Sequence, residues 1–344
     1  MTIKEYVKKY DPQNQFEVLI NTYKQVEFAW SNKYPLASLK DKKVRNIVIS
    51  GLGGSAISAD LLVNFLNNEL KVPVVVNRNY SLPSFANKNT LLIVSSYSGN
   101  TEETVSVLKE GLKKKCKIVC VSTGGKVEEI AKANKLPLVK LQPGFQPRYS
   151  LGLSFFSLLK ILQNLSLIDK QNSIVKNVVS LWKKRGLEFS KEGNTAFEFA
   201  CQMLGFIPVI YTCSGITEAA GYRLKCQFNE NSKLHAFHNV LPEMNHNEII
   251  GWESYLPKNL NSKVIFVVDE SYHPQVLKRF SICSELISSM GAEILELKSD
   301  QKDLKVRILD LIFLGDWITY YTALLRGYDP SEIDNINTLK KRLE

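Results

Sequence analysis

The sequence predicts an α/β protein made of two doubly wound domains, each built around a central parallel sheet. Apolar strand-like runs alternate with helix-length segments as far as residue 141. The order of strand, small-residue turn and helix then recurs after residue 206. A chain of 344 residues also exceeds what one hydrophobic core organises comfortably. We therefore expect domains covering residues 1–150 and 151–344, with the boundary near 145–160.

The first domain begins with residues 2–31, in which apolar side chains recur near helical spacing. Short apolar runs bounded by turn residues then predict strands, with helices between them. The expected strands cover residues 45–50, 72–76, 90–94, 117–122 and 137–141, and the expected helices follow at 56–67, from 105 and at 127–133. Because strands this apolar are buried on both faces, helices should cover both faces of the sheet.

The second domain is expected to open with two helices and to repeat the alternation. The expected helices cover 151–165, 174–189, 219–228, 275–290 and 304–326, and the expected strands cover 206–211, 263–269 and 292–297. Residues 239–252 are rich in Pro and Asn and are predicted to form a long loop. The apolar stretch 309–325 contains Asp316 and is short for a bilayer, which favours a buried helix. The tail after Gly327 should form a loop and a short helix carrying Lys340.

The charge of the chain favours small acidic partners over nucleic acid. Its 44 basic and 34 acidic residues give a net charge of +10. The basic runs at 113–115 and 340–342 are short and are not interleaved with aromatic residues, so no nucleic-acid partner is expected. A positive field of this kind steers phosphorylated substrates toward a cleft.

The cysteines and histidines predict neither disulfides nor a metal centre. The six cysteines show no close pairing, and no signal peptide or membrane span is recognised, so a reducing cytoplasmic location is expected. The four histidines form no pattern typical of a metal site. We expect no metal and no cofactor.

Residues 95–104 form a turn between an apolar strand and a helix, made almost wholly of hydroxyl, amide and glycine residues. Such a turn directs backbone N–H groups and hydroxyls at one point beside the positive end of a helix dipole, which suits a phosphate. The alternative is an ordinary polar helix cap with Glu103 in the first turn. A cap explains Thr101 but leaves the crowding of Ser96 and Ser98 unexplained.

A second turn, residues 51–56, is rich in glycine and follows the first expected strand. It also fits a loose dinucleotide-binding pattern, which alone is weak. The next strand ends in Asn77 and Arg78 where NAD binding would favour an acidic residue, so only an NADP site would remain. Because the carboxyl ends of parallel strands share one edge, two turns converging on one phosphate explain both turns better.

With these turns the chain resembles the sugar isomerase (SIS) domain, a flavodoxin-like fold that binds phosphosugars. Further stretches are similar to one family, the bifunctional phosphoglucose/phosphomannose isomerases, and the resemblance covers nearly the whole chain. These stretches are Pro147-Arg148, residues 227–231, residues 242–248 and Leu339-Lys340. The bulky Tyr149 after Arg148 is a mild departure from the family pattern, which would favour a small residue there.

The resemblance implies an aldose–ketose isomerase that interconverts fructose 6-phosphate with glucose 6-phosphate and mannose 6-phosphate through an enediol. It implies that Arg148 stabilises the enediol, Glu230 is the base, and His246 and Lys340 assist ring opening. It also implies a homodimer in which His246 enters the partner's site. The implied phosphate-binding residues are Gly54, Ser55, Ser96, Ser98 and Thr101.

The residue types suit this chemistry without the resemblance, because isomerisation needs a carboxylate base, a cation near O1 and O2, and a proton donor to the ring oxygen. Each residue also has a plainer interpretation. Glu230 and Arg148 would be surface charges, His246 a loop residue, and Lys340 a helix cap. A phosphosugar-binding regulatory protein on the same fold is the alternative function. It would need the turns but neither Glu230 nor Arg148, and usually a DNA-binding segment, which is not recognised here.

Overall fold

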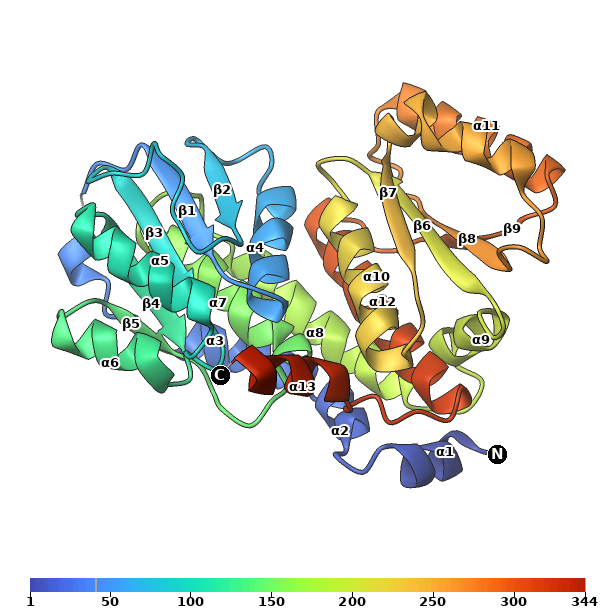
Figure 1. Ribbon diagram of the computed structural model, residues 1–344, viewed down its shortest axis with the longest axis horizontal. Coiled ribbons are helices and arrows are strands. Elements are labelled where there is room, and N and C mark those ends of the chain that lie inside the picture. The colour runs from blue at the N-terminus through green and yellow to red at the C-terminus, as the bar shows by residue number, and fades with distance from the viewer. Residues whose placement is uncertain (41, 344) are drawn as a thin grey trace. The chain divides into compact units, whose positions relative to one another are not determined.

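The computed structural model describes residues 1–40 and 42–343, and its chain divides into two units (Figure 1). The central unit is Thr22–Ser180, and the terminal unit combines Met1–Asn21 with Leu181–Glu344. Each unit has its own sheet, and all strand pairs in both sheets are parallel. The predicted α/β class with two parallel sheets is confirmed.

The sheet of the central unit has the order β2-β1-β3-β4-β5, which is the flavodoxin-like order. Its strands are β1 (Asn46–Ser50), β2 (Val74–Asn77), β3 (Thr90–Ser95), β4 (Lys117–Ser122) and β5 (Leu138–Lys140). Every residue of β3 is buried, which explains its continuous apolar run. The order reverses between β1 and β3, so the crevice that ligands favour lies at the carboxyl ends of these two strands.

Helices cover both faces of this sheet, as Figure 1 shows. On one face, α5 (Glu102–Lys113) and α6 (Gly125–Ala133) pack on alternate residues of β1, β3 and β4. The other face carries α4 (Gly54–Phe65) and α7 (Leu151–Asn164). Helix α3 (Thr22–Ser31) packs on α7. Two short 3₁₀ turns complete the unit: η1 (Ala37–Leu39) and η2 (Pro147–Tyr149).

The sheet of the terminal unit repeats the first four positions with the order β7-β6-β8-β9. Its strands are β6 (Ile207–Cys213), β7 (Phe237–Leu241), β8 (Ser262–Val267) and β9 (Glu293–Leu297). Helix α10 (Glu218–Ser232) follows β6 as α4 follows β1. Helix α11 (Pro274–Ser289) follows β8 as α5 follows β3. The repeated layout expected from the sequence is therefore present in the structure.

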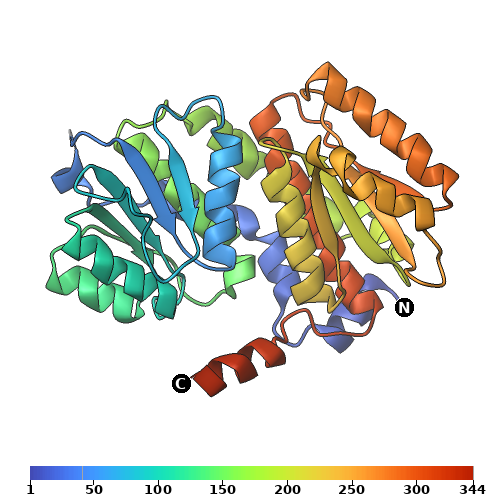
Figure 2. The same cartoon turned by 45° about the horizontal axis from the view of Figure 1, so that its top comes forward.

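Helix α12 (Leu304–Leu325) forms the centre of the terminal unit and lies beside α10 (Figure 2). It also packs on α1 (Ile3–Tyr10) and α9 (Thr195–Gln202). Its length and composition would suit a membrane span, but 89% of its most apolar window is buried inside the protein. The predicted buried helix is confirmed. The remaining helices are α2 (Gln15–Ile20), α8 (Asn172–Phe189), which crosses the boundary between the units, and α13 (Asp334–Leu343).

The units differ from the predicted domains 1–150 and 151–344 in both end segments. Residues 151–180 lie in the central unit because α7 packs on α3 and α4. Residues 1–21 lie in the terminal unit because α1 packs on α12 and Tyr320 donates a hydrogen bond to the Asp11 carboxylate at 2.8 Å. Contacts distant in sequence decide these assignments, and local sequence pattern does not record them.

Three local expectations also need correction. The predicted helix 2–31 is three helices, because the Asp11 carboxylate accepts the N–H groups of Gln15 and Phe16 and starts α2 after a break. The predicted loop 239–252 begins inside β7 and continues as two 3₁₀ turns, η3 (Glu243–His246) and η4 (Glu248–Ser254). Helix α9 was not expected. β7 is a short edge strand whose polar residues hide its strand pattern.

Candidate functional site

The turns after β1 and β3 meet in the central unit. The N–H of Tyr97 donates to Ser55 Oγ at 3.3 Å, which joins one turn directly to the other. A Cβ atom at Gly51 would lie 2.8 Å from the carbonyl oxygen of Ser95, so only glycine allows this approach. The structure thus brings the two predicted turns together, while their binding of a phosphate stays a prediction.

The hydroxyls of the second turn form a cluster. Ser96 Oγ lies 3.0 Å from Thr101 Oγ1 and accepts the N–H of Gly99 at 3.1 Å. Ser98 is exposed, and its Oγ accepts the N–H of Asn100 at 3.3 Å. Thr101 is the N-cap residue of α5, yet its side chain makes no capping hydrogen bond. An ordinary helix cap therefore does not account for the Thr101 hydroxyl.

The second turn is braced by the loop after β4. Gly99 has a φ of +73°, and a Cβ atom there would lie 1.8 Å from the carbonyl oxygen of Gly124. The Asn100 side chain accepts the N–H of Lys126 at 3.0 Å. The conformation of residues 96–101 is therefore fixed by a neighbouring loop as well as by its own hydrogen bonds.

Arg148 lies next to the first turn. A Cβ atom at Gly54 would lie 2.6 Å from the carbonyl oxygen of Pro147 and 3.4 Å from the Arg148 nitrogen, so Gly54 permits η2 to approach α4 closely. Only 4% of Arg148 is exposed, which excludes a solvated loop cation in this structure. Tyr149 is also buried, with its ring 5.3 Å from the Arg148 guanidinium carbon. The bulk of Tyr149 is accommodated in the interior of the central unit.

Tyr97 is a supporting residue that the sequence analysis did not select. Its hydroxyl donates to the carbonyl oxygen of Gln142 at 3.0 Å and accepts the N–H of Phe145 at 2.9 Å. Burial raises the pKa of Tyr97, so the phenol stays protonated at neutral pH. Tyr97 thereby ties the second turn to the loop that leads into Arg148. Its position between two candidate phosphate-binding residues, Ser96 and Ser98, is the sequence feature that could have identified it.

In the terminal unit, Glu230 is partly buried in the last turn of α10, and the residues around it anchor that helix to α12. The Arg223 guanidinium bonds both Asp316 oxygens, at 3.0 and 2.8 Å. Gln227 donates to the same carboxylate at 3.0 Å, and Asn231 donates to Thr319 at 3.2 Å. These buried polar contacts fix the rotation of α10 about its axis and its position along α12.

His246 is exposed in η3, beyond the carboxyl end of β7. Glu230 lies near the amino ends of the strands of the same sheet, whereas His246 lies beyond their carboxyl ends. The reason is that α10 runs back from the carboxyl end of β6 to the amino end of β7 (Figure 1). Twelve helical residues separate Glu230 from the start of α10, which corresponds to roughly 20 Å. Within the terminal unit, the structure does not bring these two predicted catalytic residues together.

Lys340 lies in α13, in which no residue is buried. Its ammonium group has no hydrogen bond or ion pair within residues 1–40 and 42–343. The structure therefore does not join Lys340 to the other predicted site residues of the terminal unit, and its catalytic role stays a prediction.

Two other histidines lie near Glu230 in sequence, and neither resembles His246. His238 is largely buried on β7, with Nε2 2.8 Å from Thr212 Oγ1. Burial, with a further effect of Lys225, lowers the pKa of His238 to about 4. It is therefore neutral at pH 7 and serves the interior, while His235 is exposed.

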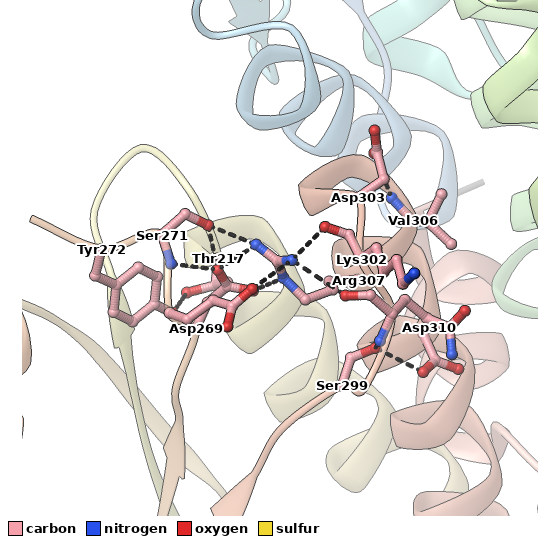
Figure 3. A network of polar contacts seen from close by, with 12 residues as sticks. Thr217, Asp269, Ser271, Tyr272, Ser299, Lys302, Asp303, Val306, Arg307 and Asp310 are labelled. Carbon is pink, nitrogen blue, oxygen red and sulfur yellow. Dashed lines mark hydrogen bonds and ion pairs between the residues drawn. The ribbon is translucent and has the colours of Figure 1, made fainter.

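The carboxyl edge of the terminal sheet is filled by the protein's own acidic groups (Figure 3). Asp269 follows β8 and is paired with Arg307 through bonds of 2.7 and 3.0 Å. Its carboxylate also accepts the N–H of Ser271 at 2.9 Å. After β6, the Glu218 carboxylate accepts from Ser214 Oγ at 3.3 Å and from the N–H of Gly215 at 3.2 Å.

Burial opposes the charge on Asp269, but Arg307 and Ser271 outweigh it and hold the pKa of Asp269 below its usual value. Thr217 is hydrogen-bonded to Tyr272 in the same region.

Among the described residues, no group of three or more His, Cys, Asp or Glu side chains is arranged to hold a metal ion.

Known proteins similar to this chain share both its length and its fold. The family described as bacterial phosphoglucose isomerase C-terminal SIS domain matches residues 192–343. A bifunctional phosphoglucose/phosphomannose isomerase of Caldicellulosiruptor bescii is 36% identical over 335 residues, covering 95% of this chain and 98% of that protein. Its counterpart in Aquifex aeolicus is 33% identical, covering 87% and 91%.

A solved glucosamine-6-phosphate deaminase of Thermotoga maritima has the same fold, with a TM-score of 0.68 at 13% identity over 92% of this chain and 95% of that one. At that identity the likeness concerns the fold alone. The sequence relatives are similar over nearly their whole length at more than 30% identity. The chain therefore belongs to the family of bifunctional phosphoglucose/phosphomannose isomerases.

Proposed function

We propose that this protein is an aldose–ketose isomerase that interconverts fructose 6-phosphate with glucose 6-phosphate and with mannose 6-phosphate. The observation that carries the proposal is the junction of two glycine- and hydroxyl-rich turns beside a buried arginine in a chain of this family. We place the reaction in sugar-phosphate metabolism of the cytoplasm, in keeping with the unpaired cysteines.

The phosphate of the substrate is assigned to the central unit. Ser55, Ser96, Ser98 and Thr101 supply hydroxyls, and the N-terminal ends of α4 and α5 supply amides and positive dipole ends. An interaction with the phosphate lies far from the reacting carbons, so its role is to position the sugar.

Ring opening is assigned to His246, assisted by Lys340. A proton passes to the ring oxygen as its bond to the anomeric carbon breaks, and the anomeric hydroxyl gives up its own proton to form the carbonyl. Histidine suits this step because its charge changes near neutral pH. His246 is exposed and has no hydrogen bond within the described residues, so its imidazole is available to a substrate.

Proton transfer between C1 and C2 is assigned to Glu230. Its carboxylate takes the proton from one carbon to form the enediol and returns it to the other. Arg148 opposes the negative charge that develops on the two oxygens, and its burial strengthens that interaction. Loss of the proton from C2 removes its configuration, so the same intermediate serves glucose and mannose 6-phosphates.

The site is further proposed to be shared in a homodimer, with Glu230 from one chain and His246 from the other. The support is the position of the two residues at opposite edges of one sheet, which prevents the terminal unit alone from joining them. Mixing inactive Glu230→Gln and His246→Asn subunits should then restore activity. Random pairing predicts up to about a quarter of the wild-type rate, because half the dimers would hold one intact site.

A coupled assay on both hexose 6-phosphates tests the proposal directly. Isomerisation of both sugars that survives exhaustive EDTA treatment is the expected result, because proton transfer by carboxylate and histidine requires no metal. Binding of phosphosugars without turnover would instead favour the regulatory alternative. Activity that zinc alone restores after EDTA would contradict the proposed mechanism.

A further inference from the structure

The segment Pro242–Glu248 carries His246 and is held in place chiefly by polar side chains. We infer that Glu248 is a positioning residue, whose carboxylate fixes the turn that presents His246 to the ring oxygen of the sugar. The inference rests on the proposed function, because it assigns Glu248 to the ring-opening step and to no other.

Two donors from the sheet hold the Glu248 carboxylate. The hydroxyl of Tyr211, on β6, donates to one carboxylate oxygen at 2.7 Å, and the Asn239 amide, on β7, donates to the other at 2.5 Å. Tyr211 in turn accepts the indole N–H of Trp252 at 2.9 Å. Since both oxygens are engaged by separate strands, the carboxylate has one position relative to the sheet.

The phenol of Tyr211 is a permanent donor. Burial raises its pKa, and the charge of Glu248 raises it further. Tyr211 is fully buried and Trp252 is 8% exposed, so the bonds of this network are shielded from competing water.

The other residues of the segment are anchors as well. Asn245 donates to Cys283 Sγ at 2.9 Å and accepts from Arg279 at 3.3 Å, which ties the turn to α11. Met244 is completely buried, and Asn247 donates to Glu243 at 2.9 Å. His246 is the polar side chain of this segment that has no such bond within the described residues. This pattern is typical of a turn built to present one group.

Close packing around Glu248 would not hold the turn in place if the hydrogen bonds of its carboxylate were lost. A cavity of about 500 Å³ opens beside it, lined in part by Trp252, Tyr255 and Leu256. With room to move into, η4 and the preceding turn would shift once the carboxylate lost its donors. A displacement near 1 Å in a reacting group is enough to cost about 100-fold in rate.

The test compares two substrates in the full-length enzyme. Fructose 6-phosphate must open its ring, whereas its analogue lacking the 5-hydroxyl cannot form the furanose and needs no ring opening. The measured ratio is kcat/KM for fructose 6-phosphate divided by kcat/KM for the analogue. This ratio does not depend on how much of a variant is folded, so a destabilised variant remains informative.

Glu248→Gln keeps the length of the side chain but turns an NH₂ group toward one of its two donors. We expect its ratio to fall tenfold or more, as in His246→Asn, because only the ring-closed substrate uses the histidine. Glu253→Gln is the matched control, since Glu253 is exposed and has no recorded partner in the described residues. Its ratio should stay within twofold of wild type. Asn239→Ala removes one donor and should give an intermediate ratio.

An unchanged ratio in Glu248→Gln overturns the inference, even if total activity falls, because a merely structural role reduces both reactions equally. A ratio lowered as much by Glu253→Gln would also overturn it, as a general charge effect. If the ratio is unchanged in Glu248→Gln while wild type turns over both substrates, the proposed function stands and only the positioning role fails. If wild type turns over neither substrate, the proposed function itself fails.

Discussion

In the central unit, the turns after β1 and β3 present hydroxyls and amides at the carboxyl edge of the sheet, whereas in the terminal unit the turns after β6 and β8 are filled by acidic side chains. Glu218 and Asp269 accept from groups that, by position, correspond to the proposed phosphate-binding groups of the other unit. The same strand order thus supports one edge that is proposed to bind an anion and one edge that is closed by the chain itself.

The difference indicates a division of labour between two copies of one layout. A phosphate entering the terminal edge would meet two carboxylates, and their repulsion would add to the loss of the Arg307 pair. The terminal unit instead carries the proposed base Glu230 and the proposed acid His246, which lie outside that edge network. Four changes would sharpen or break this comparison.

The largest effect is expected from Glu230→Gln, which keeps the shape of the side chain and removes its basicity. The kcat should fall by about 100-fold or more, the usual contribution of a general base, while phosphosugar binding stays near normal. Steady-state kinetics and calorimetric binding of the substrate measure the two quantities separately. Near-normal turnover would show that the terminal unit does not supply the base.

Arg307→Met should destabilise the protein by about 3 kcal/mol, because it leaves the buried Asp269 carboxylate without its cation. Glu270→Gln is the control, since Glu270 contacts the same guanidinium from an exposed position and should change stability by less than about 0.5 kcal/mol. Urea unfolding gives both values.

The wild-type chain should also bind one inorganic phosphate per chain in calorimetry, and a second site of similar affinity would break the comparison.

Ser98→Ala and Thr101→Val should each raise KM by roughly tenfold, because each removes a hydroxyl donor to a charged group. Some loss of kcat is also expected, since remote binding energy positions the sugar. Ser214→Ala changes the corresponding turn of the terminal unit, where Glu218 takes the hydroxyl bond, and should leave KM unaltered. Equal effects in both units would mean that the turns have no separate roles.

The smallest effect concerns the stability of the fold in acid. It is expected from the terminal unit, because all four histidines of the chain lie there. His238 has a lowered pKa of about 4 and an unfolded value near 6.5. The unfolded chain therefore binds more protons between these values, and stability falls as pH decreases. From pH 6 to pH 5 this histidine should cost about 1 kcal/mol.

Urea unfolding at several pH values measures that cost. His238→Gln should flatten the dependence between pH 6.5 and pH 4, while His235→Gln, at an exposed position, should leave it as in wild type. Parallel profiles for the His238 variant and wild type would remove His238 as the cause.

Most strands and helices followed from sequence pattern, as did the two turns proposed to bind phosphate, whereas the roles of Glu230 and His246 were implied by the family resemblance. β3 is apolar at nearly every position because it is buried on both faces, and its following turn was visible as a run of small polar residues. β7 was missed because its five residues, Phe-His-Asn-Val-Leu, form neither a continuous apolar run nor a regular alternation of polar and apolar residues. Tyr97 was missed because its contacts are with a loop some 45 residues away.

By itself, the sequence determined the fold class and the two glycine- and hydroxyl-rich turns, because periodicity and glycine placement are local properties. Its resemblance to a known family supplied the candidate base and acid. Only the tertiary structure decided which segments belong to each unit, that the terminal edge is closed by Asp269 and Arg307, and that Tyr211 and Asn239 bind Glu248. Each of these depends on pairs of side chains from distant positions. Their free energies come from burial and mutual geometry, which no local pattern in the chain encodes.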